Sequence, residues 1–274
     1  KSGAKNFAEY PKFTSFKESY VFYQRQAIQG GVYKKNNFYF QLTPFEIDSL
    51  DNFTNAGINF KGTFVSAGIF PDFDESLRLM DDYSLGFERE TPPSGVAVYN
   101  GKGQYTSKIK LSNEGLKGDG KLEYITSTTY SNDFTFYPDS MRCIAKDYVI
   151  EEKPTAVEYP PVLAKNTKVR WLPKNDVMVN YSQDTPFSMY DGSTLNGSIA
   201  LRPKGLSGDG TFKFEKAELE ADKFNFKFQE FTSDTADFRL LDEIGSDAQS
   251  FNTKNVNPYV NFKERLGEFK SNGG

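Results

Sequence analysis

A repeat with a spacing of ninety residues constrains the fold of this chain more than any other feature. Residues 109–120 read IKLSNEGLKGDG and residues 199–210 read IALRPKGLSGDG. The similarity then continues without a gap to Tyr148 and Phe238. Similarity at a fixed spacing indicates a repeated structural unit. The identical pairs are Ile109/Ile199, Leu111/Leu201, Gly115/Gly205, Leu116/Leu206, Gly118/Gly208, Asp119/Asp209 and Gly120/Gly210.

Both copies contain short runs in which apolar and polar residues alternate, such as TFKFE and FNFKF in the second copy. This period of two predicts β-strands with one face turned inward. The segment EKAELEADK has the composition of a helix. Its partner in the first copy, TSTTYSND, is poor helix material, so we predict strands at both places. An aromatic content of 16% also favours a β-rich body.

The glycines of GLxGDG predict sharp reversals of the chain, because glycine adopts positive φ without strain. Many short strands separated by such corners favour a parallel β-helix or a related open β-roll, that is, a β-solenoid. A tandem pair of β-sandwiches is the alternative. The residues assigned to structural turns are Gly115, Gly118, Asp119, Gly120, Gly205, Gly208, Asp209 and Gly210.

Three segments are expected in one continuous body. Residues 1–97 form a β-rich segment with a short helix near 44–51, for which Thr43 is the predicted N-cap, Pro44 the first helical residue and Glu46 part of a capping box. Residues 98–187 hold the first repeat and a Pro-containing connector, and residues 188–274 hold the second repeat and a tail. The ends of the sequence read as those of a piece from a longer polypeptide.

Composition excludes several classes of function. The chain has no histidine and one cysteine, Cys143, so zinc sites and Ser-His or Cys-His nucleophiles are excluded. The formal net charge of −4 argues against nucleic acid as a partner. No apolar run reaches the roughly 18 residues of a membrane-spanning helix. No metal or cofactor is expected.

Two groups of side chains are candidates for binding or catalysis. Clustered carboxylates could serve glycoside hydrolysis, which uses paired acids, although carboxylates on exposed loops are usually only solvated. Aromatic residues near the unit boundaries could stack on sugars, although most aromatics must lie in the core. A calcium site at GDG is disfavoured, because calcium-binding repeats need copies close together. The carboxylates are Asp72, Asp74, Glu75, Asp81 and Asp82. The aromatic residues are Tyr99, Trp171, Tyr181 and Tyr190.

Three stretches carry a family resemblance: FVSAGIFPDFDESL at residues 64–77, the GLxGDG motifs, and TADFRLL from residue 235. They resemble very large, uncharacterised exported repeat proteins of Bacteroidota. A fainter similarity links AELEADKFNF to periplasmic lipopolysaccharide-transport and assembly proteins with open β-rolls. The first resemblance implies O-glycosylation at Asp-Ser/Thr before a small or apolar residue. It makes Ser49, Ser140 and Thr235 candidate acceptors.

These observations predict a non-enzymatic, exported β-repeat module that acts as a structural scaffold or as an adhesion surface. Its expected location is the periplasm or the cell surface of a Gram-negative bacterium, and its expected partners are glycans or other envelope proteins. The alternatives are a polysaccharide-active enzyme that uses Asp and Glu, and a lipid or glycolipid conduit of open-roll type. The oligomeric state stays open.

Overall fold

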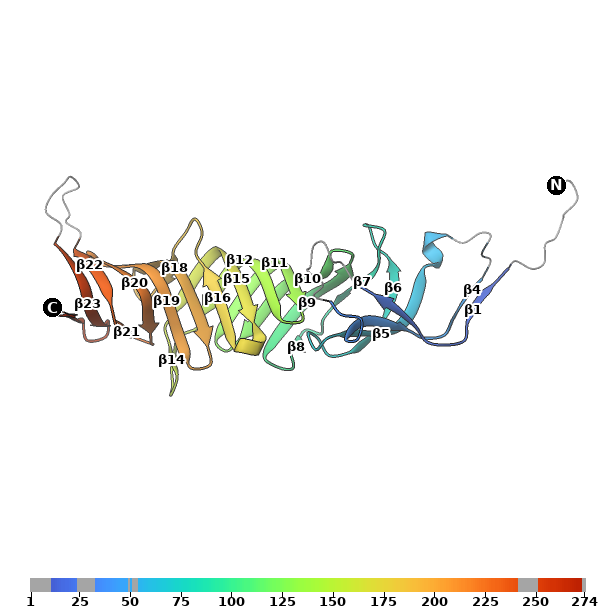
Figure 1. The fold of residues 1–274 in the computed structure, drawn as a ribbon, viewed down its shortest axis with the longest axis horizontal. Coiled ribbons are helices and arrows are strands. Elements are labelled where there is room, and N and C mark those ends of the chain that lie inside the picture. The colour runs from blue at the N-terminus through green and yellow to red at the C-terminus, as the bar shows by residue number, and fades with distance from the viewer. Residues whose placement is uncertain (1–10, 24–32, 49, 51–53, 241–250, 273–274) are drawn as a thin grey trace, which may run out of the picture. The chain divides into compact units, whose positions relative to one another are not determined.

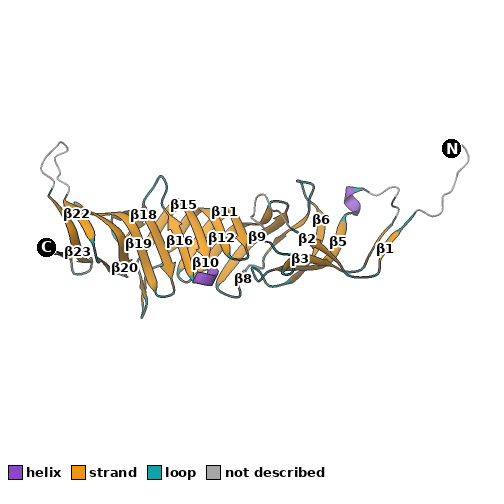
Figure 2. Cartoon of the chain, in the orientation of Figure 1, coloured by secondary structure: helices purple, strands orange, loops and turns teal. Residues whose placement is uncertain are grey.

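The protein is almost entirely β-structure (Figures 1 and 2). The computed structural model describes residues 11–23, 33–48, 50, 54–240 and 251–272. They divide into two compact units, Lys1–Gly118 with Thr135–Pro138, and Asp119–Phe134 with Asp139–Gly274. In the described residues, no helix has the length and apolarity needed to cross a membrane. The expected all-β class is confirmed.

The first unit is built on strands that pair mostly in chain order. β2, β3, β5, β6 and β7 form a continuous antiparallel ladder, and both β7 and β8 pair with β9. β1 pairs with β4 as a separate two-stranded sheet. The elements are β1 (Phe13–Ser15), β2 (Ser19–Phe22), β3 (Phe38–Leu42), β4 (Phe45–Ile47), η2 (Asn55–Gly57), β5 (Asn59–Ser66), β6 (Phe73–Leu79), β7 (Leu85–Glu90), β8 (Val96–Val98) and β9 (Gly103–Ser112).

Two strands, β10 (Gly115–Tyr124) and β11 (Ser127–Tyr137), contribute residues to both units. The second unit continues with β12 (Ser140–Ile150), β13 (Lys153–Pro154), β14 (Glu158–Tyr159), β15 (Val162–Leu172), η3 (Pro173–Asn175), β16 (Val177–Tyr181), β17 (Phe187–Met189), β18 (Ser193–Arg202), β19 (Gly205–Phe214), β20 (Ala217–Phe226), β21 (Glu230–Ser233), β22 (Ala236–Leu240), β23 (Asn252–Asn261) and β24 (Leu266–Ser271). Figure 1 shows β15, β16, β18 and β19 side by side.

The strands repeat with the spacing seen in the sequence. β9, β10 and β11 begin at residues 103, 115 and 127, and β18, β19 and β20 begin ninety residues later at 193, 205 and 217. The first ten residues of β11 have the same pattern of buried and exposed positions as the ten residues of β20. Ala217–Phe226 is therefore a strand, as predicted against its helical composition, because its inward side chains fill the same places as those of its partner.

In each copy, two short strands share one place in the ladder. The second half of β18 pairs with β16 and its first half with β17. β9 pairs in the same way with β7 and β8. The structural copies therefore already include β7 and β16, which lie before the segment boundaries expected at residues 98 and 188.

The prediction of a parallel β-helix is wrong, because the ladders of the described residues are antiparallel. The physical reason lies in the connections. Only two residues separate β9 from β10, β10 from β11, and β11 from β12. Such turns join antiparallel neighbours, whereas parallel strands need crossovers of a dozen residues or more.

The predicted helix near 44–51 is also wrong at residues 45–47; residues 49 and 51–53 of this range are not described. Phe45–Ile47 is the strand β4, whose partner is β1. The Phe45 ring packs 4.8 Å from Phe60 and 5.9 Å from Phe13, between ring centroids. A single helical turn is costly to nucleate. Strand pairing and aromatic packing outweigh the capping-box signal here.

The second unit folds its sheet over itself around a filled interior. Tyr124 of β10 lies 4.8 Å from Trp171 of β15, between ring centroids. The hydroxyl of Ser127 in β11 lies 3.8 Å from the sulfur of Met178 in β16. Neither strand pair is adjacent in the ladder, so these contacts join facing layers. Farther along, Phe212, Phe224, Phe226 and Phe231 are fully or almost fully buried together.

Candidate functional site

The GLxGDG motifs lie inside strands and not at reversals of the chain. Each motif opens a strand, at Gly115 in β10 and at Gly205 in β19, and the chain turns in the two residues before it. Both first glycines have positive φ, +98° and +135°. The following leucines, Leu116 and Leu206, are buried in both copies. The two motifs therefore occupy equivalent surroundings in their strands.

The middle glycine of each motif makes room for an aromatic ring. A Cβ added to Gly208 would meet the ring of Phe226 at 2.9 Å, and one added to Gly118 would meet the ring of Phe136 at 2.9 Å. Phe136 and Phe226 are themselves ninety residues apart. Both copies thus use the same ring-on-backbone contact, which explains why this position has no side chain.

The last glycine of the motif bends its strand. Gly210 has φ of +112° and pairs with Gly197, whose φ is +156°. The ladder between β19 and β20 shifts register between Gly208 and Gly210, which defines a β-bulge. Gly120 also has positive φ. Bulges let a strand turn a corner and pass from one layer to the other. The exposed Asp209 carboxylate beside this bend accepts a hydrogen bond from the Ser198 hydroxyl.

A hydroxyl residue fastens the same bend from the neighbouring strand, and we call this arrangement the hydroxyl clamp. The backbone N–H of Ser182 donates to the carbonyl oxygen of Gly197 at 2.9 Å, and its Oγ accepts the Gly197 N–H at 2.9 Å. In the first unit Thr91 makes both bonds to Ser107, also at 2.9 Å. Ser107 has φ of +100°. Sequence reasoning missed the clamp, because the residues around Thr91 and Ser182 differ.

The aromatic residues predicted to bind sugars do not form an exposed platform. Trp171 is fully buried, and Tyr99 is buried with its hydroxyl donating to the Tyr137 carbonyl. The half-buried Tyr190 donates to the carbonyl oxygens of Lys227 and Glu230, and burial raises its pKa well above the usual value. Only Tyr181 of the four is well exposed, at 44%. A single ring offers little stacking surface.

Three of the five candidate catalytic carboxylates are engaged in structural contacts. Asp74 accepts a hydrogen bond from Thr63 at 2.7 Å, and Glu75 lies 3.7 Å from the guanidinium of Arg89. Asp82 accepts from the Ser84 hydroxyl, and this hydrogen bond lowers the pKa of Asp82. A general acid needs a raised pKa. Asp72 and Asp81 are exposed.

The candidate glycosylation sites differ in accessibility. Thr235 is exposed in the turn between β21 and β22. Ser140 is buried at the start of β12 and donates to Asp139. Ser49 lies outside the described residues. In the folded chain, Thr235 is therefore more accessible than Ser140.

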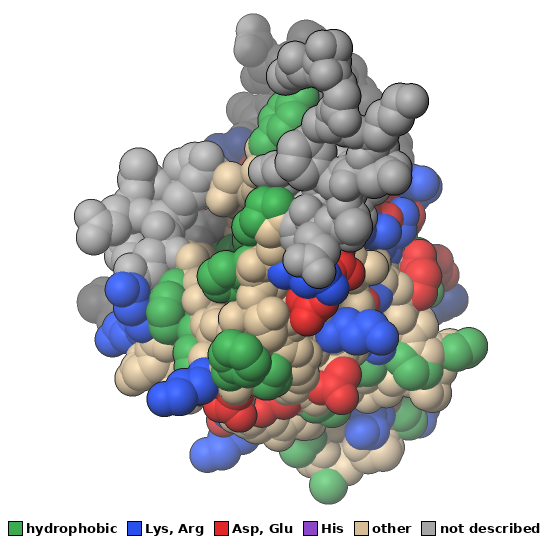
Figure 3. Space-filling model, turned by 90° about the vertical axis from the view of Figure 1, so that its right-hand side faces the viewer, with side chains coloured by type: hydrophobic (Ala, Val, Ile, Leu, Met, Phe, Trp, Pro, Cys, Tyr) green, Lys and Arg blue, Asp and Glu red, His purple; other side chains and the backbone are tan. Residues whose placement is uncertain are grey.

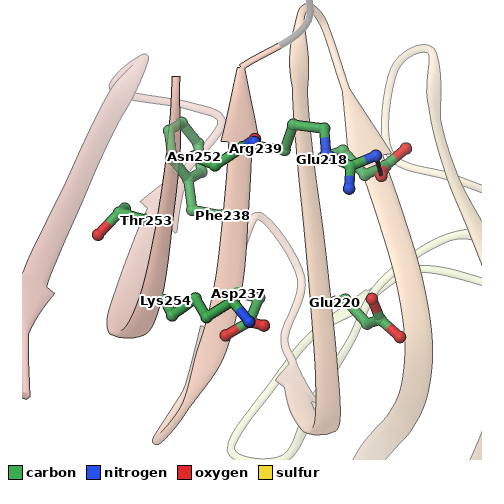
Figure 4. A pocket seen from close by; sticks show the side chains of 8 residues that line it. All are labelled: Glu218, Glu220, Asp237, Phe238, Arg239, Asn252, Thr253 and Lys254. Atoms are coloured by element: carbon green, nitrogen blue, oxygen red, sulfur yellow. Dashed lines mark hydrogen bonds and ion pairs between the residues drawn. The ribbon is translucent and has the colours of Figure 1, made fainter. Parts of the chain in front are cut away.

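Charged side chains line a shallow hollow over β20, β22 and β23 (Figure 4). Arg239 lies opposite Glu218, with a side-chain distance of 3.4 Å. Glu220 lies directly opposite Asp237, so two like charges face each other across the ladder. Asp237 also accepts the backbone N–H of Asn255 at 3.2 Å. In the described residues, no group of three acidic or cysteine side chains could hold a metal ion.

We expect Glu220→Lys to stabilise the second unit by about 0.2–1 kcal/mol, because it replaces a like-charge cross-strand pair with an opposite-charge pair. Urea unfolding followed by fluorescence measures the change. Glu220→Gln should give a smaller gain, since it removes repulsion without adding attraction. The gain of Glu220→Lys should shrink in 1 M salt. A loss of stability would contradict the pairing of Glu220 with Asp237.

The face shown in Figure 3 has basic and acidic side chains interspersed with apolar ones, without a field of one sign. Comparison with protein-family models, with curated proteins and with solved structures found no match.

Proposed function

We propose that the protein is a non-enzymatic scaffold module, an open roll of antiparallel strands whose repeats extend one another. The observation that carries the proposal is the filled interior of the second unit, where the rings of Phe212, Phe224, Phe226 and Phe231 are fully or almost fully buried. A lipid conduit would need an open groove lined by such rings. A glycoside hydrolase uses one carboxyl group with a raised pKa as its general acid, whereas the hydrogen bond from Ser84 lowers the pKa of Asp82.

The equivalence of the copies supports a scaffold in a second way. Repeat proteins bury their cores by stacking equivalent units, so that one unit completes the next. Here β15 of the first copy pairs directly with β16 of the second copy. The proposed location, exported to the periplasm or the surface of a Gram-negative cell, rests on the resemblance to exported repeat proteins. The proposed partners are other envelope proteins bound through the turns.

Insertion of one more repeat tests the proposal. A second copy of residues 177–265, placed between Arg265 and Leu266, should fold and lengthen the particle, because β24 occupies the same place after β23 as β16 does after β15. Small-angle scattering and circular dichroism measure the length and the strand content. The control is an insertion of the same residues in scrambled order, which should not fold.

Assays of the unmodified protein complete the test. We expect no release of reducing ends from a panel of polysaccharides, and no stoichiometric lipid in organic extracts of the purified protein. Polysaccharide turnover lost on Asp74→Asn would establish the enzyme instead. One bound lipid per chain would establish the conduit.

A further inference from the structure

The last strand, β24, pairs with β23 at the end of the second copy in the way that β16, which opens the second copy, pairs with β15 at the end of the first. Trp171 of β15 pairs with Met178 of β16, and Val260 of β23 pairs with Gly267 of β24. Both pairs are displaced by 89 residues (260 − 171 and 267 − 178). β16 has β15 on one edge and β18 on the other. In the described part of the chain, β24 has β23 on one edge and no strand on the other.

The unpaired edge of β24 carries defined backbone groups. The N–H of Asn272 donates to the carbonyl oxygen of Asn255 in β23 at 3.0 Å. Successive residues of a strand direct their N–H and C=O groups to opposite edges, so those of Gly267, Phe269 and Ser271 point away from β23. An open row of donors and acceptors is a template for a further strand.

Ser271 corresponds to Ser182 at the same displacement of 89 residues (271 − 182). Ser182 fastens the positive-φ residue Gly197 through the hydroxyl clamp, and Thr91 fastens Ser107 in the same way. Ser271 is thus the third hydroxyl residue in this series. It is exposed, and no residue described in the structure occupies the place of Ser107 or Gly197 beside it.

Side chains on β24 lack the cover that side chains at the equivalent positions of β16 have. Asn180 of β16 is fully buried, whereas Phe269 at the equivalent position is 37% exposed. The Phe269 ring packs on Phe238, at 4.6 Å between centroids. Leu266 is 41% exposed, and every residue of β24 is exposed. Exposed apolar side chains on an open strand edge indicate a binding surface.

We propose that the free edge of β24 binds an antiparallel strand with the residue pattern of β18, supplied by a further repeat of this class. The β16–β18 ladder fixes the register: Met178 pairs with Leu201, and Asn180 pairs with Ile199. The incoming strand therefore places its counterpart of Ile199 opposite Phe269. Its counterpart of Gly197, a residue with positive φ, lies against the hydroxyl of Ser271.

This inference deepens the proposed scaffold function and rests on it. It names the chemistry of the next element in the array: an alternating strand whose small, positive-φ residue fits the clamp. It also explains why β24 carries phenylalanine on its inner face, because that ring is covered once the strand is added.

A labelled peptide of residues 193–202, the β18 sequence, is the probe, and the full chain is the receptor. Fluorescence anisotropy should show saturable binding. Ser271→Ala should weaken it by about 2- to 10-fold, since it removes one or two hydrogen bonds. Phe269→Pro should abolish it, because proline removes an outward N–H without breaking a bond to β23. Hydrogen exchange should slow at Gly267, Phe269 and Ser271.

Lys270→Ala is the matched control, because the backbone groups of Lys270 face β23; it should bind the peptide like the parent chain. Trp171 fluorescence verifies that each variant is folded. Absence of saturable binding, or binding that survives Phe269→Pro, would overturn the inference. A dimer detected by sedimentation would also overturn the inference if Phe269→Pro dissociates it and if it does not bind the peptide. The free edge of β24 would then bind a second copy of this chain. If the chain with the inserted residues 177–265 folds but the peptide does not bind, the inference about the β24 edge is wrong and the proposed scaffold function stands.

Discussion

Phe231→Ala is expected to lower the free energy of unfolding of the second unit by about 3–5 kcal/mol, the usual cost of truncating a buried phenylalanine. The ring of Phe231 is fully buried. It lies 4.8 Å from Phe212 and 5.9 Å from Phe224, between centroids. Because β20 lies between β19 and β21 in the ladder, the rings on all three strands would border the cavity left by the change.

Urea unfolding followed by tryptophan fluorescence measures this loss, since Trp171 is the chain's single tryptophan and lies in the same unit. Tyr181→Ala is the control, because that ring is 44% exposed and its removal should change stability by no more than about 0.5 kcal/mol. A loss below about 1 kcal/mol for Phe231→Ala would mean that the interior is loosely packed. It would remove the main argument against a lipid conduit.

Gly210→Val is the second change with a large expected effect, a loss of about 2–5 kcal/mol from strain and overpacking together. Gly210 has φ of +112°, a conformation that valine rarely adopts. A Cβ at this position would also lie 2.3 Å from the carbonyl oxygen of Asn196 in β18. The strand could escape the clash only by undoing its bend.

Gly205→Val separates the two contributions. Gly205 lies in the same strand with φ of +135°, and among the described residues beyond its two chain neighbours no atom lies within 4 Å of an added Cβ. The loss of stability in Gly205→Val should come from backbone strain alone. It should be smaller than the loss in Gly210→Val by about 1 kcal/mol or more. Equal losses at Gly205 and Gly210 in urea unfolding would show that the bend at Gly210 has no steric requirement.

The class of the fold was predictable from local pattern. Alternation of apolar residues predicted strands at TFKFE and FNFKF, and the structure places residues 211–214 in β19 and residues 224–226 in β20. The repeat was also sufficient to assign Ala217–Phe226 against its helical composition, because equivalent places in a repeat share one structure. The direction of pairing did not follow from this pattern, because it depends on the two-residue connections after Ser112 and Tyr124, which the structure defines and which require antiparallel neighbours.

The candidate sites were predicted less well, because accessibility is a tertiary property. Trp171 and Tyr181 both stand in alternating runs, yet one ring is fully buried and the other is 44% exposed. The clamp at Ser182 had no sequence signal of its own. It became visible only when the strand register placed its hydroxyl against the positive-φ residue Gly197.

The sequence by itself determined that this protein is built from short strands in two equivalent copies, since the period of two and the spacing of ninety residues are properties of the linear chain. Only the tertiary structure decided why GLxGDG has its glycines. Gly208 accommodates the Phe226 ring and Gly210 bends the strand, and both requirements arise from neighbouring strands in contact. The open edge at β24 is likewise a property of pairing, because a free edge is defined by the partner that a strand lacks.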